Sequence, residues 1–154
     1  MSDQTANKSP SPLAPAESPA AIEHLKMIQA IIARLAGNSA QCKTWCITIA
    51  AAIVAFAGAM KNEKMIALAL IPLAIFGFID AAYLANERAY RDLYNEVVAK
   101  IRGGTYRLSD AFVLAAPAGR RHYQAAHRSW SVWPVYLGLI VAYLLVRLSG
   151  LLTY

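Results

Sequence analysis

The sequence predicts an all-α membrane protein with three transmembrane helices, the first two forming a tight hairpin with cytoplasmic helical extensions. Three runs without a charged residue lead to this prediction: Thr44–Met60, Met65–Ile79 and Trp130–Val146. Each has 15 to 17 residues, a little under the ~20 that usually cross a bilayer as a helix, and interfacial Trp and Lys side chains can close that gap. The hydrophobic content of 58% also exceeds that of ordinary soluble domains.

Composition divides the chain into seven segments. The first is rich in Ser, Pro and Ala and has too few large apolar side chains to offset its ordering entropy. In order, we predict a disordered N-terminal tail (1–18), an amphipathic cytoplasmic helix (19–43), transmembrane helix 1 (44–60), transmembrane helix 2 (65–79), a charged cytoplasmic helix (80–102), a basic cytoplasmic loop (103–129) and transmembrane helix 3 (130–147).

The amphipathic segment opens with Ser18 as the N-cap and Pro19 at the first helical position. Its apolar residues recur at steps of three and four, a spacing that would place them on one face. They are Leu25, Ile28, Ile32 and Leu35, and the same heptad continues through Ser39, Cys42, Cys46 and Ile49. Three interpretations are open: packing on a neighbouring helix of the same chain, a coiled-coil contact between subunits, or a helix lying flat on the membrane. Gly37-Asn38 could permit a bend.

Transmembrane helix 1 carries small residues at four-residue spacing, Ala51, Ala55 and Ala59. Such a stripe lets another helix approach closely, and we expect it to mediate packing in a homo-oligomer. Trp45 is expected at a membrane interface. The two cysteines of the chain, Cys42 and Cys46, are four residues apart, outside a CxxC motif, and have no further His or Cys at metal-ligand spacing, so we interpret them as small apolar residues.

Transmembrane helix 2 contains Pro72, which removes a backbone hydrogen bond and is expected to kink the helix. Asp80 follows directly after the apolar run. An acidic residue at this depth is a functional hypothesis by default. It is either an interfacial carboxylate bonded to water, Lys43 or another donor, or a point of ion or proton contact.

The helix is expected to continue past Asp80 and to end at Gly103-Gly104. Its charges are spaced four apart in three predicted pairs, an arrangement that supports a solvated helix. The pairs are Glu87–Arg91, Arg88–Asp92 and Glu96–Lys100. This segment and the amphipathic helix should emerge on the same side of the membrane and pack together as a short stalk.

The segment before the third apolar run is basic. Arg120, Arg121 and Arg128 precede Trp130 and Trp133, and this arrangement is typical of a membrane interface that contacts anionic lipid headgroups. Two histidines lie nearby at positions 122 and 127, off the four-residue spacing of a helical metal site. No RNA- or DNA-binding signature accompanies the charge, so no nucleic-acid partner is predicted.

The distribution of Lys and Arg predicts the orientation. Four precede the first run and eight lie between the second and third, which gives twelve on one side; two in the turn and one after the third run give three on the other. The positive-inside rule then places the N-terminus and stalk in the cytoplasm of a multi-pass inner-membrane protein.

The layout resembles a known family. The stretch from Ile22 to Gln29 (IEHLKMIQ), then Asn38-Ser39 and Lys43-Thr44-Trp45, followed by a hairpin and a charged helix, resembles the SLATT-type two-transmembrane proteins found beside bacterial antiphage defence genes. The resemblance covers about residues 22 to 101 and implies a homo-oligomeric membrane effector or pore. The chain departs from that plan by its third run and by lacking a fused nucleotide-sensing or nuclease domain.

No catalytic constellation was found. The sequence has no HExxH motif, no P-loop and no recognisable nucleophile–base pair, so we predict no enzymatic activity and no cofactor. The alternative to an effector or pore is a membrane scaffold or assembly partner that docks another cytoplasmic protein through its cytoplasmic helices.

Overall fold

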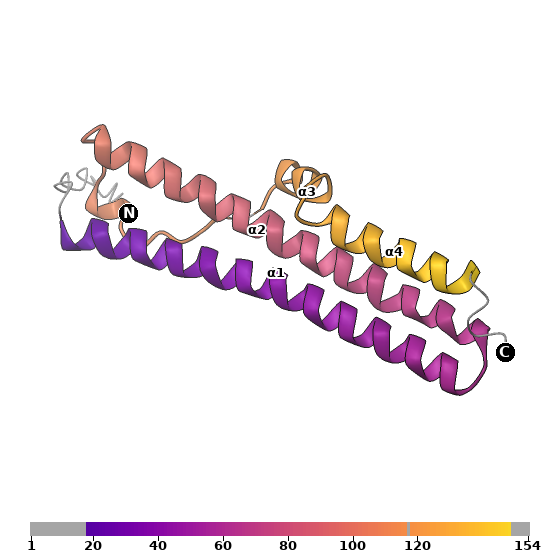
Figure 1. Ribbon diagram of the computed structural model, residues 1–154. Helices are drawn as coiled ribbons and strands as arrows, with labels where there is room; N and C mark the ends of the chain where they lie inside the picture. The colour runs from indigo at the N-terminus through magenta and orange to yellow at the C-terminus, as the bar shows by residue number, and fades with distance from the viewer. Residues whose placement is uncertain (1–17, 117, 149–154) are drawn as a thin grey trace, which may run out of the picture.

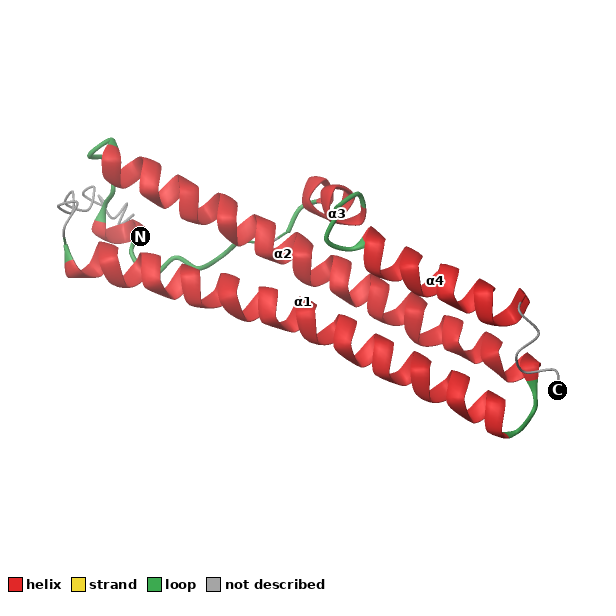
Figure 2. Ribbon diagram, in the orientation of Figure 1, coloured by secondary structure: helices red, strands yellow, loops and turns green. Residues whose placement is uncertain are grey.

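The computed structural model describes residues 18–116 and 118–148, and this part of the chain is helical without a β-strand (Figure 2). The predicted tail, apart from Ser18, and the chain after Leu148 lie outside the described residues. The elements are α1 (Pro19–Ala59), the 3-10 helix η1 (Glu63–Ala69), α2 (Leu70–Arg102), the 3-10 helix η2 (Leu108–Asp110), α3 (Arg120–His127) and α4 (Trp133–Leu148).

Helix α1 is uninterrupted over 41 residues, so the two predicted segments 19–43 and 44–60 form one helix. Its start is as predicted: Ala21 donates its N–H to Ser18 Oγ at 3.3 Å, and Pro19 occupies the first turn. Gly37 and Asn38 do not break it. At 1.5 Å per residue its length is about 60 Å, roughly twice the thickness of a bilayer's hydrocarbon core.

Helix α2 begins later than predicted. The run from Met65 was expected to be α-helical throughout, but its first part is the 3-10 helix η1. Pro72 therefore lies in the first turn of α2, directly after the 3-10 turns of η1, and the kink expected at this proline stays a prediction. Proline is tolerated there because a first-turn N–H has no intrahelical acceptor. The predicted end is confirmed: Gly103 is the C-cap and Gly104 has φ of +63°.

Helices α1 and α2 run antiparallel and lie side by side (Figure 1). We call residues 19–43 of α1 with 80–102 of α2 the stalk, and residues 44–59 of α1 with 70–79 of α2 the apolar half. The stalk core is Ala21, Ile28, Val97 and Tyr106, with Leu25 and Ile32 against it. The core of the apolar half includes Cys46, Ala50, Leu73 and Tyr136.

The predicted stripe of α1 contacts α2 of the same chain, which corresponds to the first of the three interpretations. Ile28, Ser39, Cys42 and Cys46 are buried. Beyond Cys46 the buried position is Ala50, whereas Ile49 is 36% exposed. The seam drifts because a straight α-helix has 3.6 residues per turn and a heptad requires 3.5.

The segment 103–129 is not simply a loop, because it contains η2 and the eight-residue helix α3. Helix α3 lies beside the middle of α2, and α4 runs along the apolar half of α2 (Figure 1). The ring of Tyr136 lies over Gly77, where a Cβ atom would be 3.5 Å from Cδ1. Pro134 is in the first turn of α4, as the sequence predicted.

Two helical stretches, Pro19–Ala59 and Lys64–Arg102, are long and apolar enough to cross a membrane. Helix α4 is apolar but has 16 residues. Many large apolar side chains of these helices point outward. Among the most exposed are Phe56, Ile71, Ile75, Phe78, Leu137 and Leu145.

Candidate functional site: a buried ion pair at the junction of two halves

Asp80 is fully buried at the junction between the apolar half and the stalk. It is the first residue after the uncharged run of α2, and an ionised carboxylate without a partner at that depth would be very costly. The structure provides the partner from α1. Lys43 Nζ lies 2.7 Å from Asp80 Oδ2 and donates to Oδ1 at 2.8 Å.

Ser39 completes the cluster. Its hydroxyl donates to Asp80 Oδ1, and it also accepts from Lys43 Nζ at 3.0 Å. Ser39 and Lys43 are four residues apart, so one face of α1 presents both side chains to α2. The Lys43 side chain remains 18% exposed, while Asp80 is at 0%. The sequence had offered Lys43 as one possible partner for Asp80, and this interpretation of Asp80 agrees with the structure.

Tyr136 brings α4 to the same place. Its hydroxyl is buried and interacts electrostatically with Asp80, and Lys43 Nζ forms the ion pair with Asp80 Oδ2. The free thiols of Cys42 and Cys46 are buried on the same face of α1. The cluster therefore joins α1 directly to α2, and Tyr136 of α4 packs against it.

This arrangement is suited to holding helices together more than to moving ions. Lys43 occupies both carboxylate oxygens of Asp80, and Ser39 also contacts one of them. A buried pair of this kind contributes little net stability, yet breaking it by removing one partner is strongly destabilising. Within residues 18–116 and 118–148 no three His, Cys, Asp or Glu side chains gather as a potential metal site.

A second polar contact, in the stalk, was missed by the sequence analysis. His24 is 1% exposed, and its Nε2 lies 3.0 Å from the carbonyl oxygen of Val113. A carbonyl can only accept, so Nε2 donates to Val113, and Nδ1 forms a second hydrogen bond with the Tyr106 hydroxyl at 2.9 Å. This contact attaches the segment after α2 to the start of α1. The sequence gave no signal for it, because partners more than 80 positions apart share no local pattern.

The charge pairs of α2 are partly as predicted. Glu87–Arg91 and Glu96–Lys100 form, at 2.7 Å and 3.1 Å. The predicted Arg88–Asp92 pair is wrong. Asp92 Oδ2 instead accepts from His122 Nε2 at 3.0 Å, and Arg88 Nη2 donates to Ser129 Oγ at 2.8 Å. Residues of α3 and of the segment before α4 therefore replace the local partner.

The remaining predicted residues lie on the surface. The small-residue face with Ala51, Ala55 and Ala59 is exposed, so within this chain it does not pack against α2. The interfacial tryptophans are exposed as well: Trp45 at 53%, Trp130 at 87% and Trp133 at 55%. The three arginines assigned to the interface are also exposed; they are Arg120, Arg121 and Arg128.

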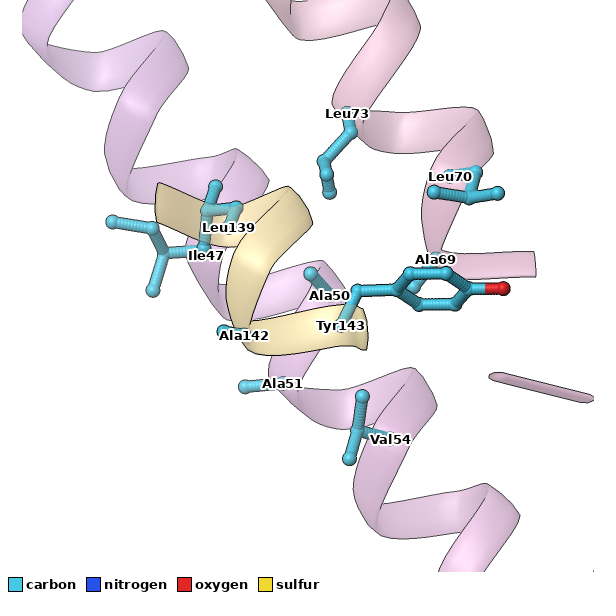
Figure 3. Close-up of a pocket in the computed structure, with 10 residues that line it drawn as sticks. All are labelled: Ile47, Ala50, Ala51, Val54, Ala69, Leu70, Leu73, Leu139, Ala142 and Tyr143. Atoms are coloured by element: carbon cyan, nitrogen blue, oxygen red, sulfur yellow. The ribbon is translucent and has the colours of Figure 1, made fainter. Parts of the chain in front are cut away.

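An apolar crevice of about 200 Å³ lies between α1, α2 and α4 (Figure 3). Side chains such as Ile47, Val54, Leu73 and Leu139 line it. The only side-chain oxygen on its wall is the hydroxyl of Tyr143, as Figure 3 shows. A site of this composition accommodates hydrocarbon, and the Tyr143 hydroxyl is the one titratable group among the described residues that line it.

No family model, no curated protein and no solved structure matches the chain, so its function is inferred from its own residues.

Proposed function

We propose that the chain is a non-enzymatic integral membrane scaffold that projects a rigid helical stalk from the bilayer. The observation that carries this proposal is the continuity of α1, whose 41 residues extend about 60 Å with an apolar half and a charged half. The hydrocarbon core accommodates about 30 Å of helix, so the stalk must stand outside it. The junction pair of Lys43 and Asp80 ties the two helices at the point of exit.

The proposed topology has three spans, with the N-terminus and the stalk in the cytoplasm and the protein in the inner membrane. The charge asymmetry of twelve against three Lys and Arg supports this orientation. Helix α4 supports a third span through its outward apolar residues, among them Val141 and Leu145. With 16 residues it covers about 24 Å, and the flanking Trp130 would extend it to the interface.

A scaffold is favoured over a pore because the apolar half presents few polar groups outward. The hydroxyls of Thr44 and Thr48 donate to carbonyl oxygens of their own helix, at 3.3 Å and 2.9 Å. Asp80 is buried against Lys43. A conducting path needs a polar or charged lining, and these side chains do not supply one.

The pore or effector is retained as the second candidate because of the exposed face with Ala51, Ala55 and Ala59. Small residues on a lipid-facing surface permit close helix contacts, so copies of the chain could assemble through it. The resemblance to SLATT-type proteins implies such an assembly and a role in defence. A homo-oligomer is compatible with either function, since several scaffold subunits could present their stalks together to a cytoplasmic partner.

Cysteine labelling tests the topology. In a background with Cys42 and Cys46 replaced by alanine, a cysteine at Asn62 should react with an impermeant maleimide in intact cells, and one at Gly104 only after permeabilisation. Both positions are exposed, so lack of labelling at Gly104 would reflect the membrane and not burial. Labelling of both in intact cells would reject the hairpin, and the reverse pattern would invert it.

Liposome leakage separates the two functions. We expect liposomes containing the pure protein to retain a trapped dye, because the apolar half offers no polar wall. A leak that Ala55→Leu abolishes and Ile49→Leu preserves would replace the scaffold with the pore. Ile49 is also exposed on α1 but lies roughly 120° around the helix from Ala55, off the small-residue face, so its replacement tests whether leucine is tolerated at another exposed position of the same helix.

A further inference from the structure

Arg88 carries a positive charge that no carboxylate neutralises in the part of the chain that the structure describes. Its guanidinium donates to the neutral hydroxyl of Ser129 at 2.8 Å. Asp92, its predicted partner, is engaged by α3: His122 Nε2 is 3.0 Å away and Arg121 Nη2 is 3.7 Å away. Arg88 is also only partly exposed, so water alone does not screen it fully.

Two further arginines share a hollow with Arg88. The hollow has a volume of about 440 Å³ and lies between α2 and α3. Arg91 is held in place by Glu87, whose side chain is only 10% exposed, at 2.7 Å. Arg121 is 86% exposed and makes only the long contact to Asp92, so it is free to reorient. The hollow is lined by Arg88, Arg91, Asp92, Asn95, Arg121, His122 and Ala125.

The charges and donors of this hollow define a class of ligand. Three guanidinium groups against Asp92 and the neighbouring Glu87 leave a net positive charge. His122 Nδ1 accepts the N–H of Gly119 at 3.0 Å, so this nitrogen has no proton to donate to a ligand. Guanidinium groups donate in pairs to phosphate oxygens, which makes arginine the preferred residue for binding phosphate.

We propose that the hollow between α2 and α3 binds the phosphate of an anionic group, with Arg88 and Arg121 as its principal donors. Ser129, which accepts a hydrogen bond from Arg88, directly precedes the exposed Trp130, and α4 starts shortly after, at Trp133. Under the proposed topology, on which this step rests, that position is the cytoplasmic headgroup layer. An anionic phospholipid and a soluble phosphate ester present the same chemistry, and the lipid is favoured by this location.

Lipid retention by the purified protein tests the site. The protein in detergent is mixed with equal amounts of phosphatidylglycerol and phosphatidylcholine, and the bound lipid is counted by native mass spectrometry. Wild type should prefer phosphatidylglycerol, because the positive choline group is repelled by the arginines. Arg88→Gln should weaken that preference about tenfold, the value of one charge-assisted hydrogen bond. Arg121→Gln should weaken it less, since its exposed side chain is partly screened.

Arg102→Gln is the matched control. Arg102 is exposed in the last turn of α2, at the far end of the stalk, and its replacement changes the net charge equally. Equal losses in Arg88→Gln and Arg102→Gln would overturn the site and leave only general charge attraction. No preference in wild type would overturn it too.

Excess inorganic phosphate identifies the source of the ligand. Phosphatidylglycerol that stays bound supports the lipid, whereas its displacement from wild type supports the same site as one for soluble phosphate. Membrane insertion is measured separately, by resistance of wild type and Arg88→Gln to carbonate extraction. Extraction of wild type would reject the proposed function, and insertion without lipid preference would reject only this site.

Discussion

The stalk and the apolar half of the α1–α2 pair bury their inner faces with different side chains. Among the described residues, the buried polar and charged side chains belong to the stalk; they are His24, Ser39, Asp80 and Glu87. The apolar half buries apolar residues such as Cys46, Ala50 and Leu73. The outward faces differ in the same way. Phe78 at the end of the apolar run is 67% exposed, whereas the stalk presents charged residues. The apolar half therefore exposes apolar side chains, and the stalk exposes charged ones.

This difference indicates where the loss of a polar contact should cost the most stability. At an exposed face of the stalk, such as that of Lys26 and Glu23, a broken polar contact can be replaced by water, so its loss is limited. At the junction with the apolar half, Asp80 has no such replacement, because it is fully buried. The effect of a substitution should therefore depend on how deeply the polar contact is buried and how near it lies to the junction, and three tests follow in order of expected effect.

The largest effect is expected for Lys43→Ala. It leaves Asp80 buried without its counter-charge, which costs about 3–5 kcal/mol of unfolding free energy. Thermal unfolding followed by circular dichroism in detergent measures it. The control is Lys26→Ala, whose ion pair with Glu23 is solvent-exposed on both sides and should contribute within about 1 kcal/mol. Combining Lys43→Met with Asp80→Leu should recover most of the stability. Equal tolerance of both single variants would contradict the comparison.

A smaller effect is expected for His24→Phe in the stalk. The variant leaves the Tyr106 hydroxyl and the Val113 carbonyl without their partner, at a cost of about 1–3 kcal/mol. The segment after α2 should then detach more often, and trypsin should cleave faster after Arg107. Adding Tyr106→Phe removes one of the unpaired groups and should slow cleavage again. An unchanged cleavage rate in His24→Phe would show that this contact does not hold the segment.

The smallest effect is expected at the end of the stalk, in acid. The N–H of Arg107 and the ammonium of Lys100 both donate to Asp110, and they lower the pKa of that carboxyl below 3.8. A carboxyl whose pKa is lower in the folded state stabilises above its unfolded pKa, and this contribution is lost as pH falls through the folded pKa. Asp110→Asn should therefore reduce the difference in unfolding midpoint between neutral and strongly acidic pH. The same difference in both proteins would contradict this assignment.

Local pattern was sufficient for much of the helical framework. Ser18-Pro19 predicted the start of α1, and Gly103-Gly104 predicted the end of α2, because caps are set by residues within one turn. The periodicity of Leu25, Ile28 and Ile32 predicted which face of α1 is buried. The late start of α2 was missed because the sequence pattern of an apolar run does not distinguish a 3-10 from an α-helical turn.

The helical class, the two long apolar stretches, the place of Asp80 at the end of an uncharged run and the basic character of residues 103–129 follow from the sequence, because they depend on composition and on neighbours within one or two turns. The pairings depend on the tertiary structure: Asp80 with Lys43, His24 with Tyr106, and Arg88 with Ser129 in place of Asp92. Those partners come from different segments, 37 to 82 positions apart. Which of several possible partners a side chain meets depends on helix register, and register results from the packing of the whole helix pair.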